Sequence, residues 1–199
     1  MTMMKKFFEL CRRDLKTERL ELRILEPTPE NAKLVWGVIR NENPNDFSFI
    51  YYSPQYKKHL PESEQETLET MIQETKAIAN NGVVWYVFYN GKLIGHHGMY
   101  YFDSNDSAQG GDVWFIKSAQ GHGFNKEIYR MLEKIAFEQL NAHRFARTCY
   151  SENINSKKCI LGGGYNMDGR IRASNKNSDG TYSDRLFFTK LVDEYNKGY

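Results

Sequence analysis

The sequence predicts an α/β (α+β) fold, in which helices flank one mixed central sheet within a single domain. The chain has 199 residues, the length of one ordinary domain. Several short segments alternate apolar and polar residues, as half-buried strands do, and others repeat apolar residues every three and four positions, as amphipathic helices do. The two kinds of segment do not alternate regularly, which disfavours a doubly wound nucleotide-binding domain.

The N-terminal third predicts one strand followed by two helices. Apolar residues take alternate positions in Thr17–Leu25, so this segment is expected to be a strand. Two prolines interrupt it, and a helix is predicted over Glu30–Arg40. The aromatic segment Asn41–Tyr52 is predicted as a loop. Ser63 and Glu66 have the spacing of a capping box, which predicts the start of a second helix.

The middle of the chain predicts three antiparallel strands joined by turns. Val83–Tyr89 and Lys92–Phe102 flank Asn90-Gly91, a strong signal for a two-residue hairpin turn. The small and polar segment Asp103–Gly111 is predicted as a turn, and Asp112–Lys117 as the third strand.

The last third predicts helices between strands. An amphipathic helix carries an apolar stripe from Ile128 to Ala136. The elements expected after it are a strand over Arg144–Tyr150, a short helix over Asn153–Leu161, and a hairpin of Tyr165–Arg172 and Tyr182–Leu191 around the polar loop Ala173–Gly180.

Composition and charge exclude several classes of protein. The chain holds 27 Lys and Arg against 25 Asp and Glu, and this net charge of +2 predicts neither a nucleic acid partner nor a membrane partner. The longest strongly apolar run, Val83–Tyr89, is far shorter than the ~20 residues of a membrane span. Residues 1–11 lack the apolar stretch of a signal peptide. Three cysteines without a C-x-x-C pair predict neither disulfides nor a metal. We therefore expect a cytoplasmic protein that binds no metal.

The most informative segment for chemistry is a glycine-rich loop between a strand and a helix. Ser118–Gly123 reads SAQGHG and precedes the amphipathic helix. Such a loop directs backbone N–H groups and the positive end of the helix dipole at one point, which suits a phosphate or pyrophosphate. No Gly-Lys-Ser/Thr follows, so the loop is not a Walker motif. A tight structural turn is the alternative interpretation.

Four segments, in this order, resemble the GCN5-related N-acetyltransferase (GNAT) family, and most of all the branch that acetylates ribosomal-protein N-termini on serine or alanine. The four segments are Thr17–Arg23, Asn90–Gly95, Gln120–Gly123, and Asn153-x-x-Ser156 with the Gly164-Tyr165 and Asp168-Gly169 pairs after it. The resemblance covers residues 17–191, with 1–16 as an N-terminal extension and 192–199 as a C-terminal tail. It implies a mostly antiparallel central sheet flanked by helices.

The resemblance implies an acetyl-CoA-dependent N-acetyltransferase that moves an acetyl group directly to a primary amine. The residues that it implies for contact with acetyl-CoA are Phe115, Ile116, Gln120, Gly121, His122, Gly123, Phe124, Asn125, Asn153 and Ser156. Two positions depart from the family pattern. Asn125 stands where the loop usually has glycine or alanine, and Ile160 stands where many members have a tyrosine acid. A catalytically inactive CoA-binding or protein-binding relative is therefore the alternative.

The catalytic roles follow from the same resemblance. Ser156 is implied to protonate or hydrogen-bond the leaving sulfur. Asp112, Asp168 and the histidine pair His96-His97 are candidates for the base, and a water molecule is a further one. The alternatives are structural, because Asn153 and Ser156 can simply cap a helix and the two aspartates can simply end strands.

The acceptor is expected to be a cationic amine. The segment 41–59 combines aromatic and acidic side chains, a lining that attracts cations. A protein N-terminus, a polyamine and an aminoglycoside-like amine all fit this description. The same aromatic residues can alternatively form a core beneath a loop. The protein is expected to be a monomer or a homodimer.

Overall fold

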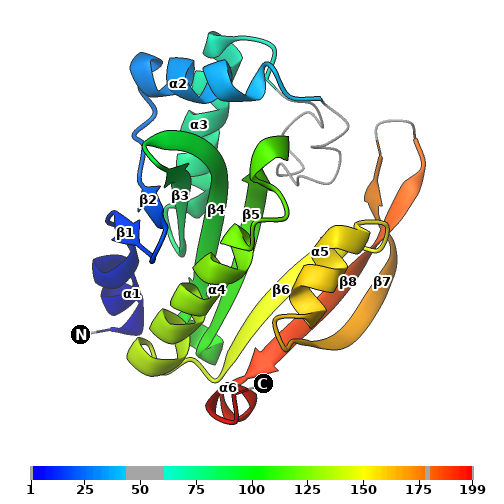
Figure 1. The fold of residues 1–199 in the computed structure, drawn as a ribbon. Helices are drawn as coiled ribbons and strands as arrows, with labels where there is room; N and C mark the ends of the chain where they lie inside the picture. Colours follow the sequence, from blue (N-terminus) through cyan, green and yellow to red (C-terminus); the bar gives the residue numbers. More distant parts are fainter. Residues whose placement is uncertain (1, 44–60, 178–179, 199) are drawn as a thin grey trace.

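The computed structural model describes residues 2–43, 61–177 and 180–198, which form a mixed sheet of eight strands with helices on both faces (Figure 1). The strands lie in the order β1-β2-β3-β4-β5-β6-β8-β7. The main elements are α1 (Met3–Cys11), β1 (Leu15–Lys16), β2 (Leu20–Arg23), α2 (Pro29–Ile39), α3 (Glu64–Ile78), β3 (Gly82–Tyr89), β4 (Lys92–Phe102), β5 (Ser107–Phe115), α4 (Phe124–Lys134), β6 (Arg144–Tyr150), α5 (Ile154–Leu161), β7 (Asn166–Lys176), β8 (Tyr182–Leu191) and α6 (Val192–Asn196). The predicted fold class is confirmed.

Strands β5 and β6 form a parallel pair and separate soon after they meet. Their pairing joins residues 107–109 to residues 144–146. The other neighbouring strands pair in antiparallel fashion. Beyond residues 109 and 146, β5 continues to Phe115 and β6 continues to Tyr150, but the two strands no longer pair with each other. They diverge in Figure 1. The divergence leaves backbone groups of both strands available in the centre of the sheet.

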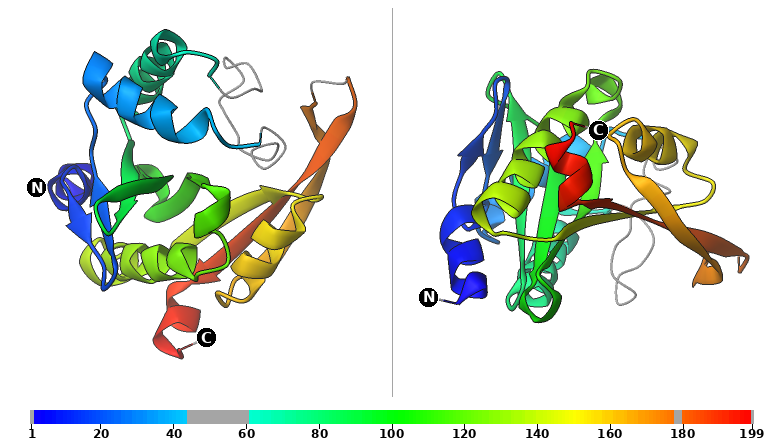
Figure 2. Two further views of the ribbon diagram at one scale, coloured as in Figure 1. Left: turned by 45° about the horizontal axis from the view of Figure 1, so that its top comes forward. Right: turned by 90° about the horizontal axis from the view of Figure 1, so that it is seen from below.

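Both faces of the sheet are buried because the central strands carry apolar residues at consecutive positions. In β3, Trp85 and Val87 belong to one core, and Tyr86 and Phe88 belong to another. Side chains of α1 and α4 complete the first core, and side chains of α2 and α3 complete the second. Figure 2 shows α4 and the α2–α3 pair on opposite sides of the sheet. Strand side chains alternate between faces, so a run without polar residues predicts this double coverage.

Two local predictions from residue chemistry are confirmed. Ser63 caps α3, because its hydroxyl accepts a hydrogen bond of 3.1 Å from the backbone N–H of Glu66. The Glu66 carboxylate in turn accepts a hydrogen bond of 2.9 Å from the backbone N–H of Glu62. Asn90 and Gly91 join β3 to β4 with φ values of +50° and +74°, which are the left-handed angles that such a hairpin turn requires.

The prediction of a turn over Asp103–Gly111 is wrong for much of that segment. The turn ends at Asp106, and β5 begins at Ser107. The small residues that suggested a turn instead allow close packing on the sheet, because a Cβ on Gly110 would lie 2.4 Å from the ring of Tyr129. Strand β5 is therefore longer than predicted, and its added residues pair with β6.

Helices that were not predicted lie near both ends of the chain. Helix α1 lies within residues 1–16, and its residues Phe7 and Cys11 are fully buried in the main core. Phe7 stacks on Tyr101 of β4, with ring centroids 5.8 Å apart. Helix α6 begins at Val192, within the segment expected to be a tail.

Several boundaries differ from the predicted ones. Strand β2 begins at Leu20 rather than Thr17. Strand β7 continues to Lys176, so residues 173–176 of the predicted loop 173–180 are strand, and residues 178–179 lie outside the described residues. The predicted loop Asn41–Tyr52 also lies outside them from residue 44 onward, as does most of the acceptor segment 41–59.

Two expectations from composition concern cysteines and membranes. The three cysteines are free thiols, and Cys11 and Cys149 are buried. Across residues 2–43, 61–177 and 180–198, every helix is too short or too polar to cross a lipid bilayer.

Candidate functional site

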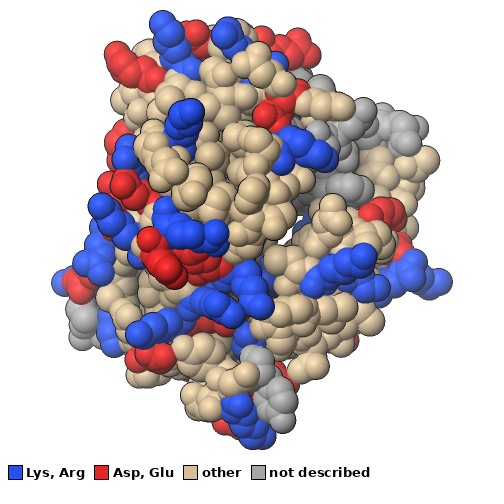
Figure 3. Space-filling model, in the orientation of Figure 1, with Lys and Arg blue, Asp and Glu red and all other residues tan. Residues whose placement is uncertain are grey.

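A cleft of about 1070 Å³ opens where β5 and β6 diverge. Residues 109–115 of β5 form one wall and residues 147–150 of β6 form another. Residues around the start of α4 and along α5 complete the lining. In Figure 3 the surface is hollowed between the two halves of the molecule, and Lys and Arg side chains lie beside the hollow. The cleft thus has polar and basic groups at the surface and sheet residues inside.

The glycine-rich loop borders this cleft and leads directly into α4. Gly121 and Gly123 have φ values of +82° and +79°, in the left-handed region that glycine adopts without strain. A Cβ on Gly121 would meet no atom of the described residues within 4 Å, so they leave the loop surface open there. Gly123 is the N-cap of α4 and supplies no side-chain cap. The first N–H groups of α4 are therefore available to an anionic ligand.

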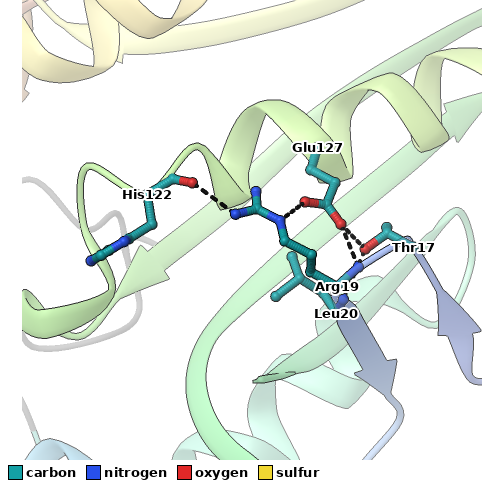
Figure 4. A network of polar contacts seen from close by, with 5 residues as sticks. All are labelled: Thr17, Arg19, Leu20, His122 and Glu127. Atoms are coloured by element: carbon teal, nitrogen blue, oxygen red, sulfur yellow. Dashed lines mark hydrogen bonds and ion pairs between the residues drawn. The ribbon is translucent and has the colours of Figure 1, made fainter. Parts of the chain in front are cut away.

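A network of polar contacts fastens this loop to the start of β2 (Figure 4). The Arg19 Nε donates to Glu127 Oε2 at 2.6 Å, and the Arg19 backbone N–H donates to Glu127 Oε1 at 2.9 Å. The Thr17 hydroxyl donates to the same Oε1 atom. Arg19 Nη1 also donates to the His122 carbonyl oxygen at 3.2 Å. Arg19 thus joins the loop, the first turn of α4 and β2.

The same network compensates the negative charge of Glu127, an acidic residue in the first turn of α4. Burial alone would raise the pKa of Glu127, but the hydrogen bonds from Thr17 and Arg19 outweigh burial and lower it. The carboxylate is therefore held by cationic and polar donors in the first turn of α4, where it would otherwise repel phosphate. Thr17 and Arg19 belong to a segment of the family resemblance to which the sequence assigned no function. Their hydrogen bonds to Glu127, 108 residues or more away along the chain, show that this segment holds the first turn of α4 in place.

Asn125, the departure from the loop pattern, directs its side chain toward α5. Its Nδ2 lies 3.6 Å from the Cys159 Sγ, and its Oδ1 is buried without a hydrogen-bond partner among the described residues. Asn125 borders the cleft together with Cys159. The asparagine therefore connects α4 to α5 behind the glycine loop.

Asn153 and Ser156 lie at the start of α5, on the cleft lining. The Asn153 side-chain oxygen accepts a hydrogen bond of 3.0 Å from the Ser156 backbone N–H, so Asn153 caps the helix. The Ser156 hydroxyl interacts with the Cys149 thiol on β6, where burial raises the pKa of Cys149. The cap uses only the backbone of Ser156, and the partner of its hydroxyl, Cys149, also lines the cleft.

Asp112 lies at a β-bulge on the cleft wall. His96 pairs with Trp114 and Gly98 pairs with Gly111, so two residues of β5 face His97 alone. Asp112 has a left-handed φ of +50° at this point. Its carboxyl accepts a hydrogen bond from the Tyr100 hydroxyl, and burial raises its pKa.

The two histidines of β4 have different environments. Ring atom Nδ1 of His96 lies 2.6 Å from the Asp112 carbonyl oxygen, and Nε2 lies 3.2 Å from the Glu74 carboxylate. Burial opposes the charge on His96, but Glu74 and Asp112 outweigh it and raise its pKa. His97 lies on the other face, where burial and Arg147 lower its pKa to about 3. His96 therefore supports the backbone of Asp112 from behind, and neither ring borders the cleft.

The structure places most, but not all, of the predicted contact residues on the cleft. Those that border it are Asp112, Phe115, Gln120, Gly121, Gly123, Phe124, Asn125, Asn153 and Ser156. Ile116 packs against both cores, and the His122 ring stacks on Phe124. Asp168 is exposed on β7, where its Oδ1 accepts a hydrogen bond of 2.9 Å from the Thr189 hydroxyl. These three side chains lie outside the lining.

Arg147 is a cleft residue that the sequence analysis missed. It is 4% exposed, and its guanidinium carbon lies 3.4 Å from the centroid of the Tyr129 ring. Its Nε has no hydrogen-bond partner among the described residues. A cation at an inward position of the strand RFARTCY was the available signal.

Metal ligation finds no support in the part of the chain that the structure describes. Within it, no group of three or more His, Cys, Asp or Glu side chains is arranged to hold an ion.

Comparisons with known proteins agree with this geometry. A family model described as an acetyltransferase (GNAT) domain matches residues 44–186, more than half of the chain. No curated protein sequence matches the chain. A GCN5-related N-acetyltransferase from Brucella melitensis matches in structure with a TM-score of 0.76 and 16% identity, over 93% of this chain and 81% of that one.

Two further solved structures contain a ligand of the CoA type. The microcin self-immunity acetyltransferase MccE, in complex with acetyl-CoA and AMP, matches with a TM-score of 0.71 and 17% identity, over 87% of this chain and 93% of that one. The ribosomal-protein alpha-N-acetyltransferase RimL, in complex with coenzyme A, matches with a TM-score of 0.73 and 18% identity, over 92% and 99%. At these identities the likeness shows a common fold.

Proposed function

The chain belongs to the GNAT acetyltransferase family, and from this premise we propose that it transfers an acetyl group from acetyl-CoA directly to a primary amine. The observation that carries the proposal is a single cleft with two chemically different parts. Its surface part presents the uncapped start of α4, and its inner part presents the bulge at Asp112. The first suits a diphosphate and the second suits a reacting carbonyl group.

The residues of the loop fit the phosphates of acetyl-CoA. The backbone N–H groups from Gly121 to Asn125 would bind the diphosphate, since Gly121 leaves the approach open. Lys126 and Lys158 also line the cleft and add positive charge. Gln120 holds the loop in shape, because its Nε2 donates to the Phe115 carbonyl oxygen at 3.1 Å.

The reaction requires the amine to lose a proton, attack the thioester carbonyl and expel the CoA sulfur. We assign the base to Asp112, directly or through water, because its carboxyl borders the cleft and burial raises its pKa. A backbone N–H of β5 near the bulge would polarise the carbonyl oxygen. The Ser156 hydroxyl would donate a hydrogen bond to the sulfur. Asp168 is disfavoured as the base because it lies outside the cleft lining.

The acceptor is proposed to be a protein N-terminus or a small-molecule amine. RimL, a ribosomal-protein alpha-N-acetyltransferase, shares the fold, which keeps ribosomal-protein N-termini among the candidates. Polyamines and aminoglycoside-like amines remain the other candidates from the sequence.

The proposal is tested by combining a binding assay with a panel of amines. Acetyl-CoA is expected to raise the melting temperature of the protein, since a ligand that binds the folded state stabilises it. Serine- and alanine-starting peptides, spermidine and an aminoglycoside are then offered with acetyl-CoA, and release of free thiol is measured. Thiol release with one of these classes supports the proposal. Binding of acetyl-CoA without transfer to any of them would favour an inactive relative, and an unchanged melting temperature would contradict the proposal.

A further inference from the structure

Arg147 occupies the inner end of the cleft, at the point where β5 and β6 separate. The last parallel pair is Gln109 with Ala146, so Arg147 is the first residue of β6 beyond it. Gly110 is the first residue of β5 beyond it, and the Tyr129 ring fills the space above Gly110. Arg147 lines the cleft although it is 4% exposed.

The positive charge of Arg147 has no acidic partner in the described part of the chain. No carboxylate there lies within 4.0 Å of its guanidinium. Its neighbours are Tyr129 of α4, Cys159 of α5 and Tyr165 of the turn after α5. The guanidinium lies over the two tyrosine rings and interacts with the Cys159 thiol. From β4, His97 faces it with a pKa lowered to about 3, and so carries no charge near neutral pH.

A second buried cation in the same core shows the contrast. Lys190 of β8 is 3% exposed, and its Nζ lies 2.9 Å from the Glu133 Oε2. Tyr165 donates to the other oxygen of Glu133 at 2.6 Å, so this carboxylate is fully engaged by Lys190 and Tyr165. A buried charge without a counter-ion is costly. The core pairs Lys190 within the protein and leaves Arg147 facing the cleft.

The proposed reaction produces an anion, the leaving sulfur of CoA, at the inner end of the cleft. Amine attack forms a C–N bond, the C–S bond breaks, and the sulfur leaves with the electron pair. The amine proton passes to Asp112 or to water. We propose that Arg147 stabilises the departing CoA sulfur as a thiolate, and that it afterwards holds free CoA in the thiolate form. This proposal rests on the proposed function.

The surroundings of Arg147 support this assignment over binding of phosphate. The proposed phosphate site is at the start of α4, about one helical turn before Tyr129, where the backbone is open to the surface. Cys159, which contacts Arg147, lies on α5 three residues after Ser156, whose hydroxyl is proposed to reach the same sulfur. A guanidinium keeps its proton at any ordinary pH, so it acts as a fixed charge rather than as an acid.

The test compares the binding of CoA with that of desulfo-CoA, which lacks the sulfur, by calorimetric titration. A site that prefers thiolate lowers the pKa of bound CoA, so the affinity ratio of CoA to desulfo-CoA should rise with pH. Each pKa unit of lowering produces about a tenfold rise in this ratio between about pH 6 and about pH 10. Effects of the phosphates are common to both ligands and cancel in the ratio. An ionised Asp112 near the sulfur disfavours the thiolate and acts against the rise, so it cannot produce the rise.

Four variants locate the charge that is responsible. Arg147→Met should remove most of the rise, because only the weaker hydrogen bond from Ser156 then favours the thiolate, and Arg147→Lys should retain more of it. Arg185→Met is the matched control, since Arg185 also lines the cleft and lies over an aromatic ring but donates to Thr148 and Asn175. It should retain the full rise, and so should Cys159→Ser, which removes the neighbouring thiol. Melting curves and desulfo-CoA affinity show whether each variant is folded.

The outcomes separate this inference from the proposed function. A wild-type ratio that stays flat with pH overturns the inference even if no variant folds. A rise that is undiminished in a folded Arg147→Met variant also overturns it. Failure of both ligands to bind the wild-type protein would refute the proposed function, and the inference with it. A rise in the wild-type protein that Arg147→Met mostly removes and Arg185→Met preserves supports the role of Arg147.

Discussion

The two ends of the cleft present positive charge in opposite ways. At the outer end, formed by the glycine loop and the first turn of α4, Arg19 is partly exposed and paired with Glu127, so the anion site consists of backbone N–H groups. At the inner end, formed by Gly110, Asp112, Tyr129 and Arg147, a buried arginine carries the charge, and no carboxylate of the described residues lies within 4.0 Å of its guanidinium.

This difference suits two kinds of anion. A diphosphate carries a permanent charge and is bound best by several hydrogen-bond donors that are already in position. Backbone N–H groups provide such donors. A charge that appears only during a reaction is stabilised most by a fixed group in a site that excludes water. The proposed function therefore assigns binding to the outer end and chemistry to the inner end, and substitutions at the two ends should change different kinetic constants.

The largest effect is expected at Asp112. Asp112→Asn should lower kcat/KM by about 10²–10⁴-fold, the usual contribution of an acid or base, while asparagine still tolerates the left-handed φ of +50°. Because the base must be ionised and burial raises its pKa, the wild-type rate should increase as pH rises through that raised pKa. A pH–rate profile measures this, and an Asp112→Asn variant with an unchanged profile would remove Asp112 from the mechanism.

An effect on binding alone is expected at Gly121. Gly121→Ala adds a Cβ where no atom lies within 4 Å but φ is +82°, so the left-handed backbone is penalised by about 1–2 kcal/mol. If the loop loses that much preorganisation, the KM for acetyl-CoA should rise about 5–30-fold with kcat unchanged. Gly37→Ala is the control, because Gly37 also has open space but lies in α2. A loss of kcat rather than affinity would contradict the division between the two ends.

A smaller effect on turnover is expected at Ser156. Ser156→Ala should lower kcat by up to about tenfold, the range of one hydrogen bond, with little change in affinity for acetyl-CoA. The cap of α5 survives because the Ser156 backbone N–H makes it. The companion variant Asn153→Ala removes the cap and should lower the stability by about 1 kcal/mol. Steady-state kinetics and thermal unfolding separate the two roles, and unchanged turnover in Ser156→Ala would exclude the hydroxyl from the reaction.

The smallest effect is expected at the anchor of the loop. Arg19 is 41% exposed on its side chain, so Arg19→Met should change the stability by no more than about 1 kcal/mol and raise the KM for acetyl-CoA a few-fold. Arg19 helps to lower the pKa of Glu127, so its stabilising contribution exists above the ordinary carboxyl pKa and is lost as pH falls through the lowered one. The difference in melting temperature between wild type and variant should therefore shrink in acid. A difference that grows in acid would contradict this pairing.

Much of the fold was predictable because its signals are local. The capping box at Ser63, the Asn90-Gly91 turn and the apolar stripe of α4 each depend on residues close in sequence. The start of β5 was not predictable in this way, since Ser107 to Gly111 resemble a turn and become a strand through the packing of Tyr129 over Gly110. Helix α1 was missed because its buried face packs against distant strand residues.

The residues of the candidate site likewise divide into those that local sequence predicts and those that depend on distant contacts. The glycine loop and the Asn153 cap are contiguous patterns that the sequence presents directly. Arg19 and Glu127 meet across 108 residues, and Arg147 becomes exceptional only when the neighbours that surround it are known. Asp168 illustrates the opposite case, because its match to a family position did not place it on the cleft.

A crystal structure of the protein with CoA would show directly whether the two ends of the cleft bind two different parts of the ligand. We expect the diphosphate oxygens to lie within hydrogen-bond distance of backbone nitrogens between Gly121 and Asn125, the pantetheine arm to follow β5, and the sulfur to lie beside the Arg147 guanidinium. A diphosphate bound away from the glycine loop, or a sulfur that stays at the surface of the cleft far from Arg147, would contradict this expectation.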